Sequence, residues 1–358
     1  MYVKSLDLKN YRNFEKLSLL PDPGINIIYG GNAQGKTNIL EAIYLGGTTK
    51  SHRGTKDRDI IRMGEEESHL RMHIIKADND YRIDMHLKKN KPKGIAIGGI
   101  PIRRAGELFG IVNMVFFSPE DLSIIKNGPS ERRKFMDLIL CELDRIYLSN
   151  LMQYNKCLNQ RNRLLHDIFF NPKLETELDI WDEQLRNYGS RLIEKRTEFT
   201  ESLNETAGRI HQNLTGKSEI LEVSYEKNTE ISDFADKQNK NREADLKLKN
   251  TSAGPHRDDL CISVNGMDLR IYGSQGQQRT AALSLKLSEI QMIEKAANEK
   301  PVLLLDDVLS ELDRDRQNYL LSSIKETQTF ITCTGLDEFV KSSFNADRVF
   351  HVVKGGIE

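Results

Sequence analysis

The sequence predicts an α/β protein in which a body with a mixed sheet and an antiparallel subdomain is interrupted by a mainly helical second lobe. Three patterns support this prediction. The apolar run Ile25–Tyr29 ends in two glycines and is followed by a helical pattern from about Lys36. Residues 70–118 alternate between apolar and polar side chains, as antiparallel strands do. Residues 130–214 are rich in Leu, Arg, Glu and Asn with little β-branched alternation, which indicates long helices.

These changes of character divide the chain into three parts. Residues 1–118 form the N-terminal half of the body, residues 119–250 the inserted lobe, and residues 251–358 the C-terminal half. Inside the lobe we expect two or more long helices with a break near Asn171–Pro172. The polar, lysine-rich residues 226–250 predict a loop.

Single elements can be assigned in chain order. In the first half we expect short strands over residues 1–29, a polar turn at residues 78–80, a tight hairpin at Gly98–Gly99 and a strand over residues 114–117. In the last part we expect strand segments over residues 260–271 with a turn at Asn265–Gly266, a helix over residues 277–297, and buried strands over residues 302–305 and 329–333.

Composition limits the class of protein. The 358 residues are 38% hydrophobic and 29% charged, with a formal net charge of −1, so any DNA-binding surface must be a local patch. The four cysteines lack metal-site spacing, which favours reduced thiols. The polar N-terminus and the short apolar runs predict a cytoplasmic protein with no membrane association.

The first chemical motif is a complete phosphate loop, Gly30 to Thr37, of the pattern GxxxxGK[ST]. Its glycines let backbone amides curl around phosphate. Lys36 is expected to reach the β- and γ-phosphates, and Thr37 to offer its hydroxyl to Mg²⁺. The alternative, a glycine turn that binds nothing, fits the strand-loop-helix context poorly.

The second motif is a carboxylate pair at the end of the run Pro301 to Asp307. A buried strand delivers both carboxylates to its C-terminal end, where α/β sheets bind ligands. We expect Asp306 to hold Mg²⁺ and Asp307 to orient or deprotonate the attacking water. Taken alone, the pair could equally be a strand end capped by acidic turn residues.

A third motif, Ser274 to Thr280, starts a long helix with a serine and a glycine. Exposed amides and a hydroxyl there make a second anion site. One nucleotide with two phosphate-binding elements predicts an ATP-dependent homodimer in which the second element serves the partner's nucleotide. The alternative is a serine N-cap followed by surface glutamines.

Taken together, the motifs resemble the ABC-type ATPase heads of the structural-maintenance-of-chromosomes class, and within that class the bacterial recombination-mediator family. The resemblance runs the whole length. The segments that carry it are Asn10–Phe14, Gly30–Ile43, Ser51–Arg53, Phe117–Leu122, Arg132–Asp137, Gly254–Leu260, Ser274–Thr280 and Asp306–Asp313.

The resemblance implies further roles. Ser274, Gln275, Gly276 and Gln277 would be the ABC signature that reaches the partner's γ-phosphate. Ser310 and Asp313 would belong to the D-loop that crosses the dimer, although Asp313 could simply cap the next helix. Ser118–Asp121 would occupy the Q-loop position. The expected catalytic residues are Asp307 and Lys36, with Thr37 and Asp306 on the metal, and the ATP-binding set is Arg12, Gly30, Gly31, Asn32, Ala33, Gln34, Gly35, Lys36, Thr37 and Asn38.

Two departures from the general ABC pattern predict slow hydrolysis. Asp307 stands where a glutamate is usual, and Thr334 stands where transporters carry a histidine. We therefore expect a weak, DNA-stimulated ATPase. By resemblance, its ATP-bound dimer would clamp double-stranded or gapped DNA and work with RecR and RecO to load RecA, and hydrolysis would reset it.

Residues 50–105 hold a local basic surplus, with 14 Lys and Arg against 8 Asp and Glu. Phosphate contacts need such local cations. The candidate DNA-binding residues are Lys88, Lys89, Lys91, Lys93, Arg132 and Arg133. The lysines could equally protect a sheet edge.

Two other functions compete with the DNA clamp. A transporter's nucleotide-binding subunit shares the loop and the signature, but the helical lobe and Thr334 argue against it. A small-molecule kinase would need only one phosphate-binding element.

Overall fold

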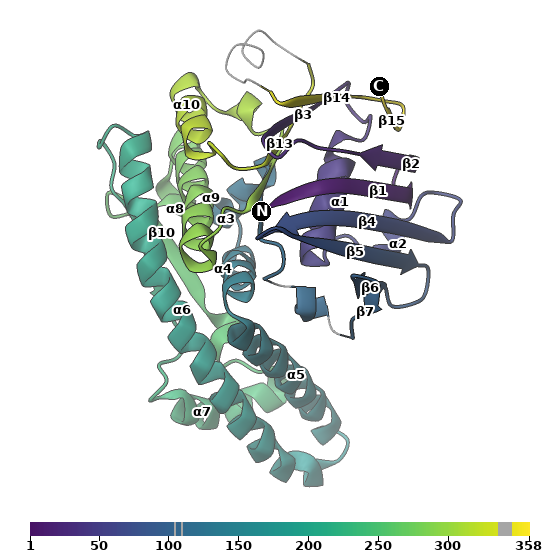
Figure 1. The fold of residues 1–358 in the computed structure, drawn as a ribbon. Coiled ribbons are helices and arrows are strands. Elements are labelled where there is room, and N and C mark those ends of the chain that lie inside the picture. The colour runs from purple at the N-terminus through teal and green to yellow at the C-terminus, as the bar shows by residue number, and fades with distance from the viewer. Residues whose placement is uncertain (104, 109, 336–345) are drawn as a thin grey trace. The chain divides into compact units, whose positions relative to one another are not determined.

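The computed structural model describes residues 1–103, 105–108, 110–335 and 346–358 (Figure 1). The chain forms two compact units. The first comprises Met1–Asp121 and Glu289–Glu358, and the second comprises Leu122–Ser288. The first boundary lies close to the one expected at residue 118. The second differs, because strand β10 (Asp259–Val264) pairs along its whole length with β9 (Leu221–Glu226), which keeps residues 251–288 in the helical unit.

The first unit contains a mixed six-stranded sheet in the order β15-β14-β3-β13-β12-β8. Its strands are β3 (Ile25–Tyr29), β8 (Met114–Phe117), β12 (Val302–Asp306), β13 (Thr329–Cys333), β14 (Arg348–Val353) and β15 (Gly356–Ile357). All pairs are parallel except β14 with β15. Strands β12 and β13, in the interior of the sheet, are almost continuously buried, as strands covered on both faces must be.

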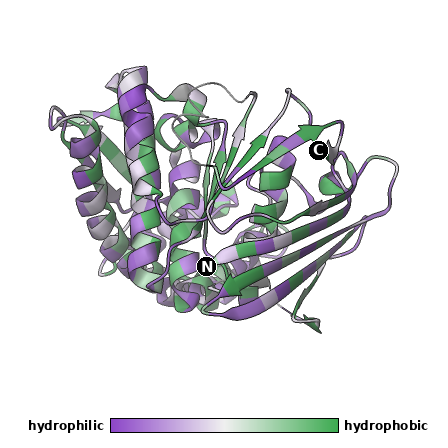
Figure 2. Cartoon of the chain, turned by 45° about the horizontal axis from the view of Figure 1, so that its top comes forward, coloured by the Kyte–Doolittle hydropathy of each residue, from purple (hydrophilic) through white to green (hydrophobic). Residues whose placement is uncertain are grey.

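A second, antiparallel sheet of six strands completes this unit, in the order β2-β1-β4-β5-β6-β7. The strands are β1 (Tyr2–Tyr11), β2 (Phe14–Leu19), β4 (Glu67–Lys76), β5 (Asn79–Lys88), β6 (Gly94–Ile97) and β7 (Ile100–Pro101). Buried and exposed residues alternate along β4 and β5, so one face is apolar and the other polar (Figure 2). Helix α1 (Lys36–Thr48) shares one hydrophobic core with residues of both sheets.

The second unit is mainly helical. It contains α3 (Ser123–Lys126), α4 (Pro129–Leu143), α5 (Arg145–Ile168), α6 (Leu178–Leu214), α7 (Phe234–Leu248) and α8 (Leu269–Tyr272), with the small sheet β11-β10-β9, where β11 is Met267–Asp268. The expected break between long helices is present as a 3-10 turn at Pro172–Glu177. Helix α9 (Gln275–Ala297) begins in this unit and ends in the first, which also holds α2 (Asp57–Ile60) and α10 (Arg314–Ser323).

The predicted fold class is confirmed, and two local predictions are wrong. Most of residues 226–250 are not a loop, because Phe234–Leu248 form helix α7 around the buried side chains Phe234, Gln238 and Asp245, and residues 227–233 connect it to β9. Residues 269–271 are not a strand, because the Asp268 carboxylate accepts the Arg270 amide and starts helix α8. Among the described helices, none combines the length and the apolar character needed to cross a bilayer.

Candidate nucleotide site

The phosphate loop connects β3 to α1 with a backbone that requires glycine at two positions. Gly30 has φ 153° and Gly35 has φ 116°. A Cβ on Gly30 would lie 2.4 Å from the Val352 carbonyl oxygen, and one on Gly35 would lie 2.6 Å from Asn13 Nδ2. Strand pairing of β3 with β14 therefore holds one end of the loop, and the Asn13 side chain holds the other.

Lys36 lies inside this loop and is 9% exposed. Its ammonium donates to the carbonyl oxygens of Gly30 at 2.7 Å and Gly31 at 2.9 Å. These two hydrogen bonds hold the positive charge of Lys36 within the phosphate loop, next to the N-terminus of α1. A helix N-terminus and a lysine together form a site for phosphate.

The loop borders a cavity of about 540 Å³, within the usual range for small-molecule sites. It is lined by Asn32, Ala33, Gln34, Gly35, Lys36, Thr37, Asn38, Arg53, Pro119, Asp306, Asp307, Thr332 and Thr334. The structure thus brings most of the phosphate loop and both predicted carboxylates to one cavity. Pro119 and Thr334, taken from the family resemblance, line it as well.

Asp306 lies beside the phosphate loop at the end of β12. The Thr37 hydroxyl donates to its Oδ1 at 2.9 Å, and the Thr332 hydroxyl donates to the same oxygen at 2.7 Å. Burial raises the pKa of Asp306 above its usual value, against the opposing effect of the two hydroxyl groups. A buried carboxylate next to a threonine hydroxyl offers the all-oxygen ligands that Mg²⁺ prefers, so these residues fit that ion.

Asp307 has a left-handed backbone, with φ 54°. Its amide donates to the Thr332 hydroxyl at 3.0 Å, and its carbonyl oxygen accepts from Ser310 at 2.8 Å. Both residues line the cavity, and the Asp306 carboxylate is the one that accepts from Thr37 and Thr332. The pair can therefore divide two tasks, cation binding and contact with water.

A buried carboxylate that sequence reasoning missed organises the surroundings. Glu41 of α1 is fully buried and accepts from Arg12 Nε at 2.8 Å, Arg12 Nη2 at 2.6 Å and Ser51 Oγ at 2.5 Å. Burial opposes ionisation of Glu41, but Arg12 and Ser51 outweigh it and hold its pKa below the usual value. A single glutamate inside the apolar stretch of α1 was the available signal for a buried partner.

This network fixes two predicted segments near the cavity. The Arg12 guanidinium donates to Glu41, to the Thr55 hydroxyl and to the Asp59 carbonyl oxygen. Arg12 is expected to contact the nucleotide, but it is not among the residues that line the cavity. Arg53, two residues after Ser51, does line it and lies 3.3 Å from Asn38 Oδ1. Ser51–Arg53 is one of the segments that carry the family resemblance, but the sequence does not predict that Arg53 lines the cavity.

Ser274 belongs to the second unit and forms a reciprocal cap at the start of α9. Its hydroxyl accepts the Gln277 amide at 3.2 Å, and the Gln277 side chain accepts the Ser274 amide at 3.1 Å. The residues between them, Gln275 and Gly276, are exposed. The helix-cap alternative is therefore true as local structure, and the cap bonds the Gln277 amide while Gln275 and Gly276 stay exposed.

In the first unit, Asp313 caps helix α10 by accepting the Arg316 amide at 3.0 Å. The cap expected from the sequence is thus present. Ser310 is exposed, and its hydroxyl donates to the carbonyl oxygen of Asp307. This hydrogen bond connects the segment from Ser310 to Asp313 to the residue that follows the C-terminal end of β12.

Two candidate DNA contacts are corrected by the structure. Arg132 is 3% exposed and forms a bidentate pair with Asp259 at 2.6 and 2.8 Å, so it cannot reach a phosphate. Lys93 donates to the Asp57 carboxylate at 2.9 Å and to the Thr49 carbonyl oxygen at 2.5 Å, which ties a loop to α2. A count of basic residues in the sequence does not show which of them form ion pairs within the protein.

The other candidates differ in exposure. Lys88 and Lys89 form ion pairs with Glu67 and Glu66 at 3.4 and 3.0 Å. Lys91 is exposed. Arg133 is partly buried and donates to the Asp258 carbonyl oxygen at 2.6 Å, and burial lowers its pKa. Lys88 and Lys91 are thus both exposed, but Lys88 is held by Glu67, whereas no ion pair is described for Lys91.

The parallel-sheet core, the phosphate loop and the carboxylate pair define an ATPase head of the class shared by SMC proteins and their relatives. The family model for the RecF/RecN/SMC N terminal domain matches residues 2–357. An Smc head domain from Pyrococcus furiosus has the same fold, with a TM-score of 0.58 at 16% identity over 100% of this chain and 95% of that one.

Proteins named RecF are much more similar to this chain than the Smc head domain is. The DNA replication and repair protein RecF of Agathobacter rectalis is 62% identical over 358 residues, covering 100% of this chain and 99% of the relative. That of Lachnoclostridium phytofermentans is 59% identical with the same coverage. A structure of the recombination mediator protein RecF with ATP in the RecFOR pathway aligns with a TM-score of 0.93 at 40% identity, over 100% and 97% of the two chains. The chain belongs to the RecF family.

Proposed function

We propose that this chain binds ATP and Mg²⁺ in the phosphate-loop cavity and hydrolyses the nucleotide slowly. The observation that carries the proposal is the meeting of Lys36, Thr37 and Asp306 in one cavity of nucleotide size. Lys36 would exchange its two carbonyl acceptors for β- and γ-phosphate oxygens. Thr37 and Asp306 would hold Mg²⁺, which when bound neutralises phosphate charge. The related RecF structure with ATP supports the choice of nucleotide.

Asp307 is the proposed catalytic carboxylate. It lines the cavity beside Asp306, and its carboxylate can orient the attacking water or accept its proton. An aspartate is shorter by one methylene than the glutamate usual in ABC heads, so the water would be held less firmly. Thr334 lines the same cavity in place of the histidine of transporters. Both features support slow hydrolysis, and stimulation of that hydrolysis by DNA is a further part of the proposal.

We also propose that ATP joins two copies of the chain. Ser274, Gln275, Gly276 and Gln277 would present the first amides of α9 to the partner's γ-phosphate, and Ser310 and Asp313 would cross the interface. The exposure of Gln275 and Gly276 supports this assignment. In a two-fold arrangement each copy supplies to its partner what it receives.

The substrate of the closed dimer would be double-stranded or gapped DNA in recombinational repair. Membership of the RecF family and the RecFOR pathway of the related RecF–ATP structure support RecO and RecR as partners. RecA loading as the outcome is part of the proposal and follows from the family resemblance. Lys88, Lys89, Lys91 and Arg133 remain the candidate phosphate contacts. Lys91 comes first because it is exposed, whereas Lys88 and Lys89 are paired with Glu67 and Glu66. Backbone-led binding would lose affinity steeply with salt and show little sequence preference.

Titration with a fluorescent ATP analogue tests the first step. Lys36→Ala should weaken binding by roughly 10- to 150-fold, the value of one or more charge-assisted hydrogen bonds of about 1.5–3 kcal/mol. Lys50→Ala, an exposed lysine just beyond α1, is the matched control and should bind like the wild type. Equal affinities for all three proteins would refute the proposed site. A second arm measures affinity for gapped duplex DNA with and without ATP, and ATP-independent affinity would refute the clamp.

A further inference from the structure

The outer face of the antiparallel sheet carries two histidines and a glutamate that the nucleotide chemistry does not use. Glu67 and His69 lie two residues apart on β4, so their side chains share one face. His86 on β5 lies directly opposite His69 in the strand register. The neighbouring pair in the register, Ser68 and Leu87, is buried on the opposite face. The sheet backbone thus fixes the positions of all three side chains.

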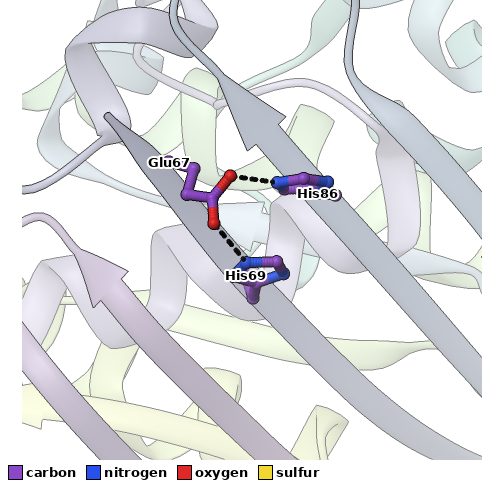
Figure 3. A group of neighbouring side chains, drawn as sticks. All are labelled: Glu67, His69 and His86. Atoms are coloured by element: carbon purple, nitrogen blue, oxygen red, sulfur yellow. Dashed lines mark hydrogen bonds and ion pairs between the residues drawn. The ribbon is translucent and has the colours of Figure 1, made fainter. Parts of the chain in front are cut away.

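The three side chains point toward one another (Figure 3). Glu67 Oε2 lies 3.1 Å from His86 Nε2, and Glu67 Oε1 lies 3.6 Å from His69 Nε2. The two imidazole rings are stacked, with centroids 4.3 Å apart and planes 13° apart. One carboxylate therefore faces the same nitrogen of two parallel rings.

This arrangement is close to that of a metal site with two histidines and one carboxylate. One ligand atom from each residue lies within 4.8 Å of the others, and within the part of the chain that the structure describes this is the one such group. Zinc holds imidazole nitrogen and carboxylate oxygen at about 2.0–2.2 Å in a tetrahedron, which puts ligand atoms about 3.3 Å apart. Small side-chain rotations bring the three atoms to that separation without moving the strands.

We propose that Glu67, His69 and His86 form a surface binding site for one divalent transition-metal ion of the zinc type. Imidazole nitrogen selects zinc, copper or nickel over magnesium, which takes oxygen ligands. The side chains are 42–45% exposed, so the remaining coordination position is open to water or to an outside ligand. This site and the phosphate-loop cavity have no residue in common.

Neighbouring charges set the affinity of the site. Lys88 Nζ lies 3.4 Å from Glu67 Oε2, and its ammonium competes with the metal for that oxygen. Lys9 is exposed and lies opposite His69 on β1. Removal of the Lys88 charge should therefore strengthen metal binding, while leaving the three ligands in place.

The same sheet face supplies a matched control. His73 Nδ1 lies 2.9 Å from Asp80 Oδ1, with Lys4 on the same carboxylate at 3.0 Å. This pair offers one imidazole and one carboxylate, one ligand fewer than the site of Glu67, His69 and His86. His73→Gln removes a histidine from the same strand and leaves the proposed site complete.

The test is titration of the full chain, without an affinity tag, with Zn²⁺ by calorimetry and with Co²⁺ by its visible absorption. The wild type should bind one ion that His69→Gln, His86→Gln or Glu67→Gln each weakens by about tenfold or more, a loss at least as large as that caused by removing an outer-shell partner. His73→Gln should leave the affinity unchanged, and Lys88→Met should raise it several-fold. Binding of fluorescent ATP in the absence of added transition metal checks that each variant is folded.

The outcomes separate cleanly. A single site lost in His69→Gln and His86→Gln but not in His73→Gln supports the proposal. Equal Zn²⁺ affinity of the wild type and a His69→Gln/His86→Gln double variant would overturn it, as would equal loss in His73→Gln. Loss of ATP binding in Lys36→Ala leaves these results unaffected, because the metal site does not depend on the nucleotide function.

Discussion

Replacement of Arg161 by methionine should unfold the helical unit at a much lower denaturant concentration. The Arg161 side chain is fully buried on α5. Its Nε donates to Asp182 of α6 at 2.6 Å, and its Nη1 donates to Asp245 of α7 at 2.7 Å and to the Thr251 hydroxyl at 2.9 Å. One guanidinium therefore holds three helices together.

The expected loss follows from what the substitution leaves behind. Asp182 keeps an ion pair with Arg242 at 2.7 Å, whereas Asp245 keeps only hydrogen bonds from Ser252 among the contacts described for it. Breaking a buried pair costs about 3–5 kcal/mol because an uncompensated charge remains. We expect a decrease of about 4 kcal/mol in the free energy of unfolding, a large share of the ~5–15 kcal/mol that stabilises a typical domain.

Urea unfolding followed by tryptophan fluorescence is a suitable assay. Trp181 is the one tryptophan of the sequence and the residue before Asp182. Like Leu246 of α7, it packs against a buried cluster of α5 and α6 residues. Arg163→Met on the same helix is the control, because its side chain is 78% exposed and should change stability by less than about 0.5 kcal/mol. The double variant Arg161→Met/Asp245→Leu should recover most of the loss. A single variant within about 1 kcal/mol of the wild type would refute the reasoning.

Three further predictions concern the nucleotide cavity and the response to acid. Gly35→Ala should abolish binding of a fluorescent ATP analogue, since its φ of 116° and the 2.6 Å approach to Asn13 leave no room for a methyl group; wild-type affinity would contradict this. Asp307→Asn should keep the left-handed backbone, which asparagine tolerates, and lower the ATPase rate by about 10²–10⁴-fold while ATP still binds; an unchanged rate would remove Asp307 from catalysis. Burial lowers the pKa of His256 from 6.5 to about 4, and the Tyr154 hydroxyl at 2.6 Å donates to its neutral ring. Because the unfolded chain then binds a proton that the folded chain does not, stability should fall as the pH drops from about 6.5 to about 4, with a loss of about 2 kcal/mol between about pH 7 and about pH 5. Urea unfolding at both pH values should show a smaller loss in His256→Gln, and an equal loss would exclude this histidine as the cause.

Local patterns were enough to predict the phosphate loop. Gly30, Gly35 and Lys36 act within eight consecutive residues, and their geometry depends on backbone angles that the residue types themselves allow. The strand that carries Asp306 was equally predictable from the sequence, because a parallel strand buried on both faces is a continuous apolar run. The parts of the site that were predictable are therefore those in which the functional residues and the element that positions them lie within one short segment.

Long-range ion pairs account for what the sequence did not reveal. Helix α7 is polar and lysine-rich, and part of its anchorage is the pair between Asp245 and Arg161, 84 residues apart. Arg132 looks like a DNA contact in the sequence because its partner Asp259 lies 127 residues further on. Helix propensity and charge counts carry no information about such partners, and tertiary contacts override them.

The central claim is that bound ATP is completed by residues of a second copy. The most direct test is the mass of the protein in solution with ATP, in the Asp307→Asn background to slow hydrolysis, for two variants at Ser274. Both Ser274→Asp and Ser274→Asn can still cap α9. Only the aspartate would set a negative charge against the partner's triphosphate. The account predicts an ATP-dependent dimer for Ser274→Asn and a monomer that still binds ATP for Ser274→Asp; dimers of equal strength in both would contradict it.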